Sequence, residues 1–307
     1  MPPPFEEVLT QLKDVKKTMP SALVAELSHL TTEEARLLDK VWPEIEAGRR
    51  RHLMEMLVEM AEENPKLDFE AIFRSRLRDP DETVRNKAVE GLWENEDTSL
   101  VNTFIDMMQK DSSAGVQASA AQNLGRFALM AEFGKLRPEY KERISKALIT
   151  ILDDEHRPIE VRRRALESMA PLNLPQTRPA IGRAYSSGNS KLKISAVNAM
   201  GKTCDPIWLS ILLKEIDNPD AEIRYEVCQA LGEIGEAEAV PHLALHTRDA
   251  DTEVQLAAIT ALGKIGGSEA KECLKKCLSI NSEPAKDAAR SALDELESDE
   301  NPFSLRS

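Results

Sequence analysis

The stretch that decides the fold is Asp217-Asn-Pro-Asp-Ala-Glu-Ile-Arg-Tyr-Glu-Val-Cys-Gln-Ala-Leu-Gly-Glu-Ile-Gly235. It recurs as Asp249-Ala-Asp-Thr-Glu-Val-Gln-Leu-Ala-Ala-Ile-Thr-Ala-Leu-Gly-Lys-Ile-Gly266, where Val254 takes the place of Ile223 at a distance of 31 residues. A fixed period of this length is typical of repeat proteins, in which each repeat is one small supersecondary unit.

The same pattern extends over most of the chain. We call the residue equivalent to Ile223 the anchor of its repeat, and the anchors are Val84, Val116, Val161, Leu192, Ile223, Val254 and Ala285. Four residues after each anchor comes Ala or Val, and eight residues after it comes Leu or Met. These positions fall on one stripe of a helix, so each repeat contributes an apolar helical face to a shared core.

Turn residues mark where this helix begins. Asp79-Pro-Asp81 and Asn218-Pro-Asp220 lie just before two of the anchors and are typical of turns and N-caps. Apolar stretches such as 208–216 predict a preceding helix in each repeat, so we call the anchor helix the second helix. A glycine follows the Leu or Met position in four repeats, and we expect it to end or bend the second helix: Gly125, Gly201, Gly232 and Gly263.

Two helices per repeat, with Asp-Pro-Asp-x-x-Val-Arg at residues 79–85, resemble the HEAT repeat. The short, regular form is similar to the HEAT-like repeats of the phycobilisome-lyase class. The resemblance covers residues 70–296 or so and implies an all-α fold, a right-handed α-solenoid (superhelix) of about seven to eight HEAT-like helical hairpins. It implies less about function, because this fold is used by scaffolds, adaptors and enzymes.

The resemblance also implies a ladder of structural charges between repeats. The matching residues are Asp79 with Arg85, Asp217 or Asp220 with Arg224, and Arg162. Gln117 and Gln255 stand where other repeats have a basic residue after the anchor, so we expect the ladder to be interrupted there.

The ends of the chain depart from the repeat. Residues 1–70 predict an atypical helical N-terminal cap with one degenerate repeat, 71–296 the HEAT-like array, and 297–307 a flexible acidic tail. The gap between Val116 and Val161 is 45 residues, which places an insertion near 126–140. Such an insertion either carries function or is neutral.

Composition argues against several functions. The chain has 53 acidic and 40 basic residues and a net charge of −13, which disfavours binding to nucleic acid or an anionic membrane. We expect no membrane span and no secretory signal. The four cysteines are too scattered for a disulfide framework, which favours a cytoplasmic protein.

Residues for catalysis do not converge in the sequence, so we expect no catalytic residue, no metal, no cofactor and no enzyme. His242 and His246 lie one helical turn apart but lack a third ligand nearby, and Cys273 and Cys277 are interpreted as core filler. HEAT-repeat deoxyhypusine hydroxylases carry His-Glu dipeptides as iron ligands, and none of the five histidines here precedes a glutamate.

One surface is a candidate for binding. Two residues after the anchors, Ile194, Tyr225 and Leu256 are predicted to form an apolar ridge on the concave face, bordered by Asn198, Gln229 and Thr260. Alternatively, these side chains pack between neighbouring second helices. The ridge suits a partner protein or peptide, so we hypothesise a non-catalytic scaffold or adaptor. The lyase resemblance implies an alternative, an accessory of cofactor attachment; nucleic-acid binding is the least favoured.

Overall fold

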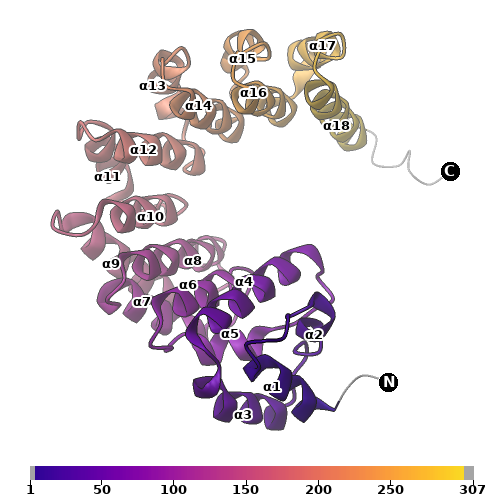
Figure 1. The fold of residues 1–307 in the computed structure, drawn as a ribbon. Coiled ribbons are helices and arrows are strands. Elements are labelled where there is room, and N and C mark those ends of the chain that lie inside the picture. Colours follow the sequence, from indigo (N-terminus) through magenta and orange to yellow (C-terminus); the bar gives the residue numbers. More distant parts are fainter. Residues whose placement is uncertain (1–3, 301–307) are drawn as a thin grey trace. The chain divides into compact units, whose positions relative to one another are not determined.

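The computed structural model describes residues 4–300, and all regular structure among them is helical (Figure 1). The chain forms two compact units. Unit 1 comprises residues 1–147 and 156–161, and unit 2 comprises residues 148–155 and 162–307. The boundary therefore runs through α9 (Pro138–Asp153) and α10 (Ile159–Met169).

Unit 1 contains the cap and the first hairpins. Its helices are α1 (Phe5–Lys13), α2 (Ser21–Ala25), α3 (Thr32–Val41), α4 (Ala47–Glu63), α5 (Glu70–Arg76), α6 (Glu82–Glu90), α7 (Ser99–Lys110) and α8 (Ala114–Glu132). The second helices α4, α6 and α8 pack in succession, while α5 and α7 cover α6 and α8. Helix α3 packs on α5, so α3 and α4 take the places of a degenerate hairpin.

Unit 2 repeats this arrangement. Its helices are α11 (Thr177–Tyr185), α12 (Ser190–Lys202), α13 (Leu209–Glu215), α14 (Ala221–Ile234), α15 (Val240–His246), α16 (Thr252–Ile265), α17 (Gly267–Cys277) and α18 (Glu283–Glu300). The second helices α12, α14, α16 and α18 lie side by side in one layer, and each is covered by the helix before it (Figure 1). Stacked helical hairpins of this kind are the architecture of an α-solenoid.

The anchors confirm the predicted register, because all seven are buried. Three residues before four of them, a short polar side chain caps the second helix: Asp81, Asn189, Asp220 and Asp251. Asp81 Oδ1, for example, accepts hydrogen bonds from the amides of Thr83 at 2.9 Å and Val84 at 3.3 Å. The N-cap and the apolar stripe together define where each second helix starts and which face it buries.

The glycines after the Leu or Met position were expected to end or bend the second helices, and the structure shows that they do not end them, because all four lie inside a helix. Gly201 lies inside α12, and a Cβ added there would stand 2.6 Å from the Cα of Ala230 on α14. Gly232 approaches Ala261 in the same way, with the added Cβ 2.9 Å from its Cα. These glycines therefore allow adjacent second helices to come into backbone contact.

The predicted tail and insertion are partly helical. Helix α18 continues through 297–300, and residues 301–307 lie outside the described residues. Residues 126–140 are divided between the end of α8, a turn at Gly134 with φ of 69°, and the start of α9. None of the described helices is both long and apolar enough to span a bilayer.

Candidate functional site

Two arginines of the predicted ladder, Arg85 and Arg224, are joined to the turn of the next repeat. Arg85 donates to both carboxylate oxygens of Asp111, from Nη2 at 2.7 Å and from Nε at 2.8 Å. Arg224 binds Asp249 in the same two-pronged way, at 2.8 and 2.9 Å. The predicted pairings of Arg85 with Asp79 and of Arg224 with Asp217 or Asp220 are corrected, because each extended arginine side chain reaches the carboxylate of the following turn.

Within its own turn each of these arginines bonds two backbone carbonyls through Nη1. Nη1 of Arg85 donates to the carbonyl of Asp79 at 2.8 Å, and Nη1 of Arg224 to that of Asn218 at 2.9 Å. Gln117 keeps this kind of contact, because Nε2 donates to the carbonyl of Asp111 at 2.6 Å. The glutamine side chain is too short to provide the second, charged contact to a following repeat.

Two further ladder residues have other surroundings. Asp217 is exposed, and its Oδ1 lies 3.5 Å from Nε2 of His246. The Nε of Arg162 is buried without a hydrogen-bond partner among the described residues. Asp217 therefore does not form the predicted pair with Arg224, which binds Asp249.

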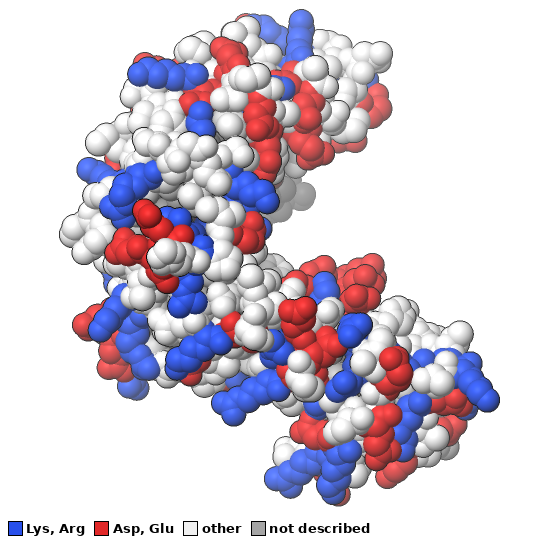
Figure 2. Space-filling model, turned by 60° about the vertical axis from the view of Figure 1, so that its left-hand side comes forward, with Lys and Arg blue, Asp and Glu red and all other residues white. Residues whose placement is uncertain are grey.

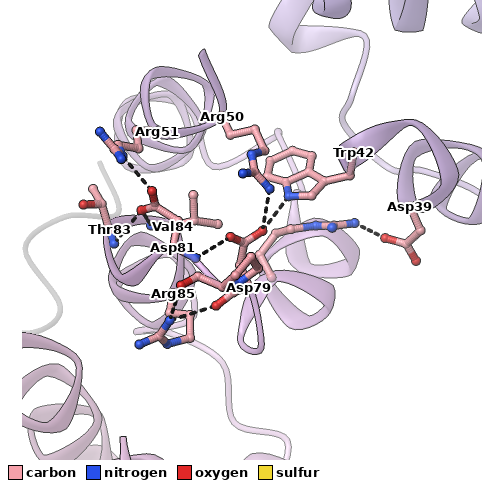
Figure 3. Close-up of polar contacts among 11 residues, drawn as sticks. Asp39, Trp42, Arg50, Arg51, Asp79, Asp81, Thr83, Val84 and Arg85 are labelled. Carbon is pink, nitrogen blue, oxygen red and sulfur yellow. Dashed lines mark hydrogen bonds and ion pairs between the residues drawn. The ribbon is translucent and has the colours of Figure 1, made fainter. Parts of the chain in front are cut away.

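Asp79 belongs to a buried cluster in unit 1 that joins the cap to the first repeats (Figure 3). Its carboxylate accepts a hydrogen bond from Nε1 of Trp42 at 2.6 Å and lies 3.5 Å from Nη1 of Arg50. Arg76 stacks 4.3 Å from the centre of the Trp42 ring and pairs with Asp39. Burial lowers the pKa of Arg76 to about 10, so this side chain remains charged at neutral pH. We interpret the cluster as structural.

The predicted apolar ridge is not continuous. Ile194 is only 5% exposed, because α12 packs against both α11 and α14. Tyr225 and Leu256 are half-buried, and Thr260 is exposed. The alternative that these side chains pack between second helices therefore applies to Ile194.

A row of polar side chains crosses the second helices of unit 2, and the sequence analysis missed it. Ser195 donates to Oε1 of Glu167 at 2.6 Å and accepts from Nε of Arg163 at 2.9 Å. One repeat further on, Nδ2 of Asn198 donates to Oε2 of Glu226 at 3.0 Å. A signal for this row was present in the sequence, because Ser195 and Glu226 are polar residues three positions after their anchors, next to the apolar stripe.

The row ends in a hollow of about 200 Å³ between α12 and α14. The hollow is lined by Asn198, Gly201, Lys202, Tyr225, Glu226, Gln229, Ala230 and Glu233. Three of the residues predicted to bind a partner thus meet here: Asn198, Tyr225 and Gln229. Nε2 of Gln229 donates to the hydroxyl of Tyr225 at 3.2 Å, whereas Oδ1 of Asn198 is buried without a partner among the described residues.

Glu226 is the unusual titratable group of the hollow. Burial raises its pKa, and the nearby Glu167 carboxylate adds to the rise, while the hydrogen bond from Asn198 opposes it. A shifted carboxyl group in a hollow is typical of functional sites. Such a group suits binding of a donor or cation, or transfer of a proton.

The thiols and histidines do not suggest another site. Burial raises the pKa of all four cysteines, to about 12 for Cys228, whereas an activated thiol requires a lowered pKa. His246 contacts the carbonyl of His242 through Nδ1 at 3.1 Å. Residues 4–300 contain no group of three or more His, Cys, Asp or Glu side chains arranged to hold a metal ion. The His-Glu dipeptide that HEAT-repeat deoxyhypusine hydroxylases use as iron ligands does not occur in this sequence.

Comparison with curated proteins shows a partial match to an enzyme. The deoxyhypusine hydroxylase of Drosophila pseudoobscura pseudoobscura is 28% identical over 106 residues, which cover 34% of this chain and 35% of the relative. The expectation that the chain is not an enzyme is contradicted by this finding and is withdrawn. It rested on the lack of convergent catalytic residues in the sequence, of which the missing His-Glu dipeptides were one part. Because the match spans about a third of either protein, the hydroxylase activity is stated of the relative alone.

Solved structures share the architecture. The complex of CpcE and CpcF of phycocyanin lyase from Nostoc has a TM-score of 0.55 at 16% identity, and the alignment covers 92% of this chain and 97% of that one. The E. coli protein YibA has a TM-score of 0.50 at 17% identity, with 92% and 98% covered. At this identity the likeness concerns the fold alone, and to that extent the predicted resemblance to the lyase class is confirmed.

The family comparison agrees with the geometry. Residues 209–294, which include α13 to α17, match the family model described as HEAT repeats. The match identifies HEAT repeats in this part of the chain, and the buried anchors and capped second helices already described continue the same helical-hairpin pattern outside it.

Proposed function

We propose that this protein is a repeat scaffold that binds an extended segment of a partner protein or peptide across α12 and α14. The observation that carries the proposal is the hollow in which Asn198, Tyr225 and Gln229 converge from two helices. Amide and hydroxyl groups beside an aromatic ring suit a peptide, whose backbone offers alternating donors and acceptors.

The buried Oδ1 of Asn198 supports the same proposal. An unpaired buried acceptor costs about 1–3 kcal/mol, so a donor from a partner would recover part of that cost. The atom is shielded from solvent, and a donor therefore reaches it only when a neighbouring side chain of the hollow moves. We also propose a cytoplasmic location, which suits four cysteines that are all free.

A site-specific photo-cross-linker tests the binding face. It replaces Tyr225 in one version of the protein and Leu245 in a control; Leu245 lies in the other helical layer and is 73% exposed. We expect a discrete cross-linked protein from position 225 only. That protein, once identified and purified, should bind the Leu245→Glu variant as well as wild type and bind Tyr225→Glu at least about tenfold more weakly.

The opposite pattern would contradict the proposal. Cross-linking from position 245, or a partner whose affinity falls with Leu245→Glu but not with Tyr225→Glu, would place binding on the other layer. Circular dichroism of both variants shows whether either substitution has disturbed the fold.

A further inference from the structure

We propose that the hollow between α12 and α14 receives an arginine side chain of the partner segment, an inference that rests on the proposed function. The hollow has a volume of about 200 Å³, which accommodates the head of one side chain but no folded element. Its occupant is therefore defined by which polar groups line the walls.

Hydrogen-bond acceptors line both walls. Glu226, Gln229 and Glu233 line the hollow from α14, and Asn198 lines it from α12, where its unpaired amide oxygen becomes accessible when a neighbouring side chain moves. An ionised carboxylate accepts up to about four hydrogen bonds, and Glu226 receives one from Asn198. A guanidinium group carries five N–H donors in one plane and no acceptor, so it can satisfy oxygens on two facing helices at once.

The charge around the hollow selects a cation. Two carboxylates of α14, those of Glu226 and Glu233, line the hollow together with one lysine of α12, Lys202. Figure 2 shows acidic side chains gathered in bands over the arm that holds α14, α16 and α18. An acidic side chain would be repelled by Glu226 and Glu233, whereas a guanidinium would be attracted.

Two lysines limit the attraction of the hollow for a cation. Nζ of Lys264 already lies 2.6 Å from Oε1 of Glu233, and Lys202 lines the hollow itself. The carboxylate of Glu226 is therefore the main counter-ion for an incoming cation. It is surrounded by Glu167 on α10, Lys202 and Asn198 on α12, and Glu222 on its own helix.

A cation would also change the titration of this glutamate. Burial raises the pKa of Glu226, and a guanidinium bound beside it would favour the ionised form and lower that pKa again. Binding should consequently weaken as the pH falls through the raised pKa of Glu226.

Fluorescence anisotropy with short labelled peptides tests the inference. The probe is an extended peptide of alternating serine and arginine, compared with versions in which lysine or glutamate replaces arginine. Glu226→Gln should weaken arginine-peptide binding about tenfold, because one charged hydrogen-bonded pair is lost. Glu253→Gln is the matched control: it makes the same charge change at an exposed site on α16 outside the hollow, and should change binding less than about twofold.

A second measurement keeps the result independent of peptide affinity. The side-chain carboxyl resonance of Glu226, assigned by its loss in Glu226→Gln, should titrate at lower pH when the arginine peptide is present. Equal weakening by Glu226→Gln and Glu253→Gln, or equal binding of the glutamate peptide, would overturn the inference. If the partner still cross-links at position 225 in that case, only the arginine specificity fails; loss of that cross-link defeats the proposed function itself.

Discussion

Two adjacent seams of unit 2, between α12 and α14 and between α14 and α16, are built on the same plan and end up different. In each, a glycine of one helix meets an alanine of the next: Gly201 meets Ala230, and Gly232 meets Ala261. The seams differ three residues after the anchor, where α14 has Glu226 and α16 has the buried Ala257.

That single position changes the character of the seam. Glu226 draws Asn198 into a hydrogen bond and leaves a polar hollow beside it, whereas Gln229, which matches Asn198 one repeat later, bonds within its own helix to Tyr225. At the turns, the seam between α14 and α16 has the stronger polar contact. There Arg224 of α14 makes the two-pronged pair with Asp249, whereas Lys193 of α12 makes a single contact to Glu215 at 2.8 Å. A regular array thus carries a local site when one polar side chain enters an otherwise apolar seam.

The largest expected effect breaks what the seams share. Gly201→Ala places a Cβ 2.6 Å from backbone on α14 and should cost about 1–3 kcal/mol of unfolding free energy through overpacking. Gly182→Ala on α11 is the control, because nothing lies within 4 Å of its added Cβ and alanine favours helix by up to about 1 kcal/mol. Urea denaturation should move the midpoint down for the first variant and up for the second. A stable Gly201→Ala would show that the helices are not in backbone contact.

The next effect sharpens the difference at the turns. Arg224→Gln reproduces the residue found at 117 and 255, keeps a carbonyl contact and loses the pair with Asp249, at a cost of about 1.5 kcal/mol. Lys264→Gln, which removes the half-exposed contact to Glu233, should cost less than about 0.5 kcal/mol. Equal urea midpoints for the two variants would refute this ranking.

The Arg224–Asp249 pair also predicts that the stability of the protein depends on pH. The Arg224 guanidinium lowers the pKa of Asp249, so this stabilisation is present above the carboxyl's unfolded value of about 3.9 and is lost as the pH falls through the folded value. The gap in melting temperature between wild type and Arg224→Gln should therefore narrow below about pH 4. A gap that is constant with pH would mean that the pair contributes packing only.

The smallest expected effect concerns the charge of Glu226 in the hollow. Its dependence on pH has the opposite sign to that of the Arg224–Asp249 pair, because ionisation of Glu226 destabilises the fold. Because burial raises the pKa of Glu226, the cost of its charge is absent below its unfolded value of about 4.3 and appears as the pH rises through the folded value. Glu226→Gln should therefore melt slightly higher than wild type at pH 7 and lose that advantage near pH 4, as followed by circular dichroism. A variant that melts lower at both pH values would make Glu226 a structural residue.

Much of the fold could be predicted because its determinants are local. The anchors, the stripe four and eight residues beyond them and the capping residue before them act within one helix, and the sequence displays them directly. Of the residues predicted to bind a partner, Asn198, Tyr225 and Gln229 line the proposed hollow and Ile194 is buried, while Glu226 was not predicted. A pattern of exposed positions does not reveal how far a neighbouring helix covers them.

The amino-acid sequence by itself determined the repeat length, the register and the helical class of this protein, because periodicity and N-caps are properties of consecutive residues. Only the tertiary structure decided that Arg224 pairs with the carboxylate of Asp249 in the next repeat, that Gly201 admits a neighbouring backbone, and that a polar hollow lies beside Glu226. Each of these depends on distances between different repeats, which are set by how closely whole helices pack and by side chains about 30 residues apart in the chain.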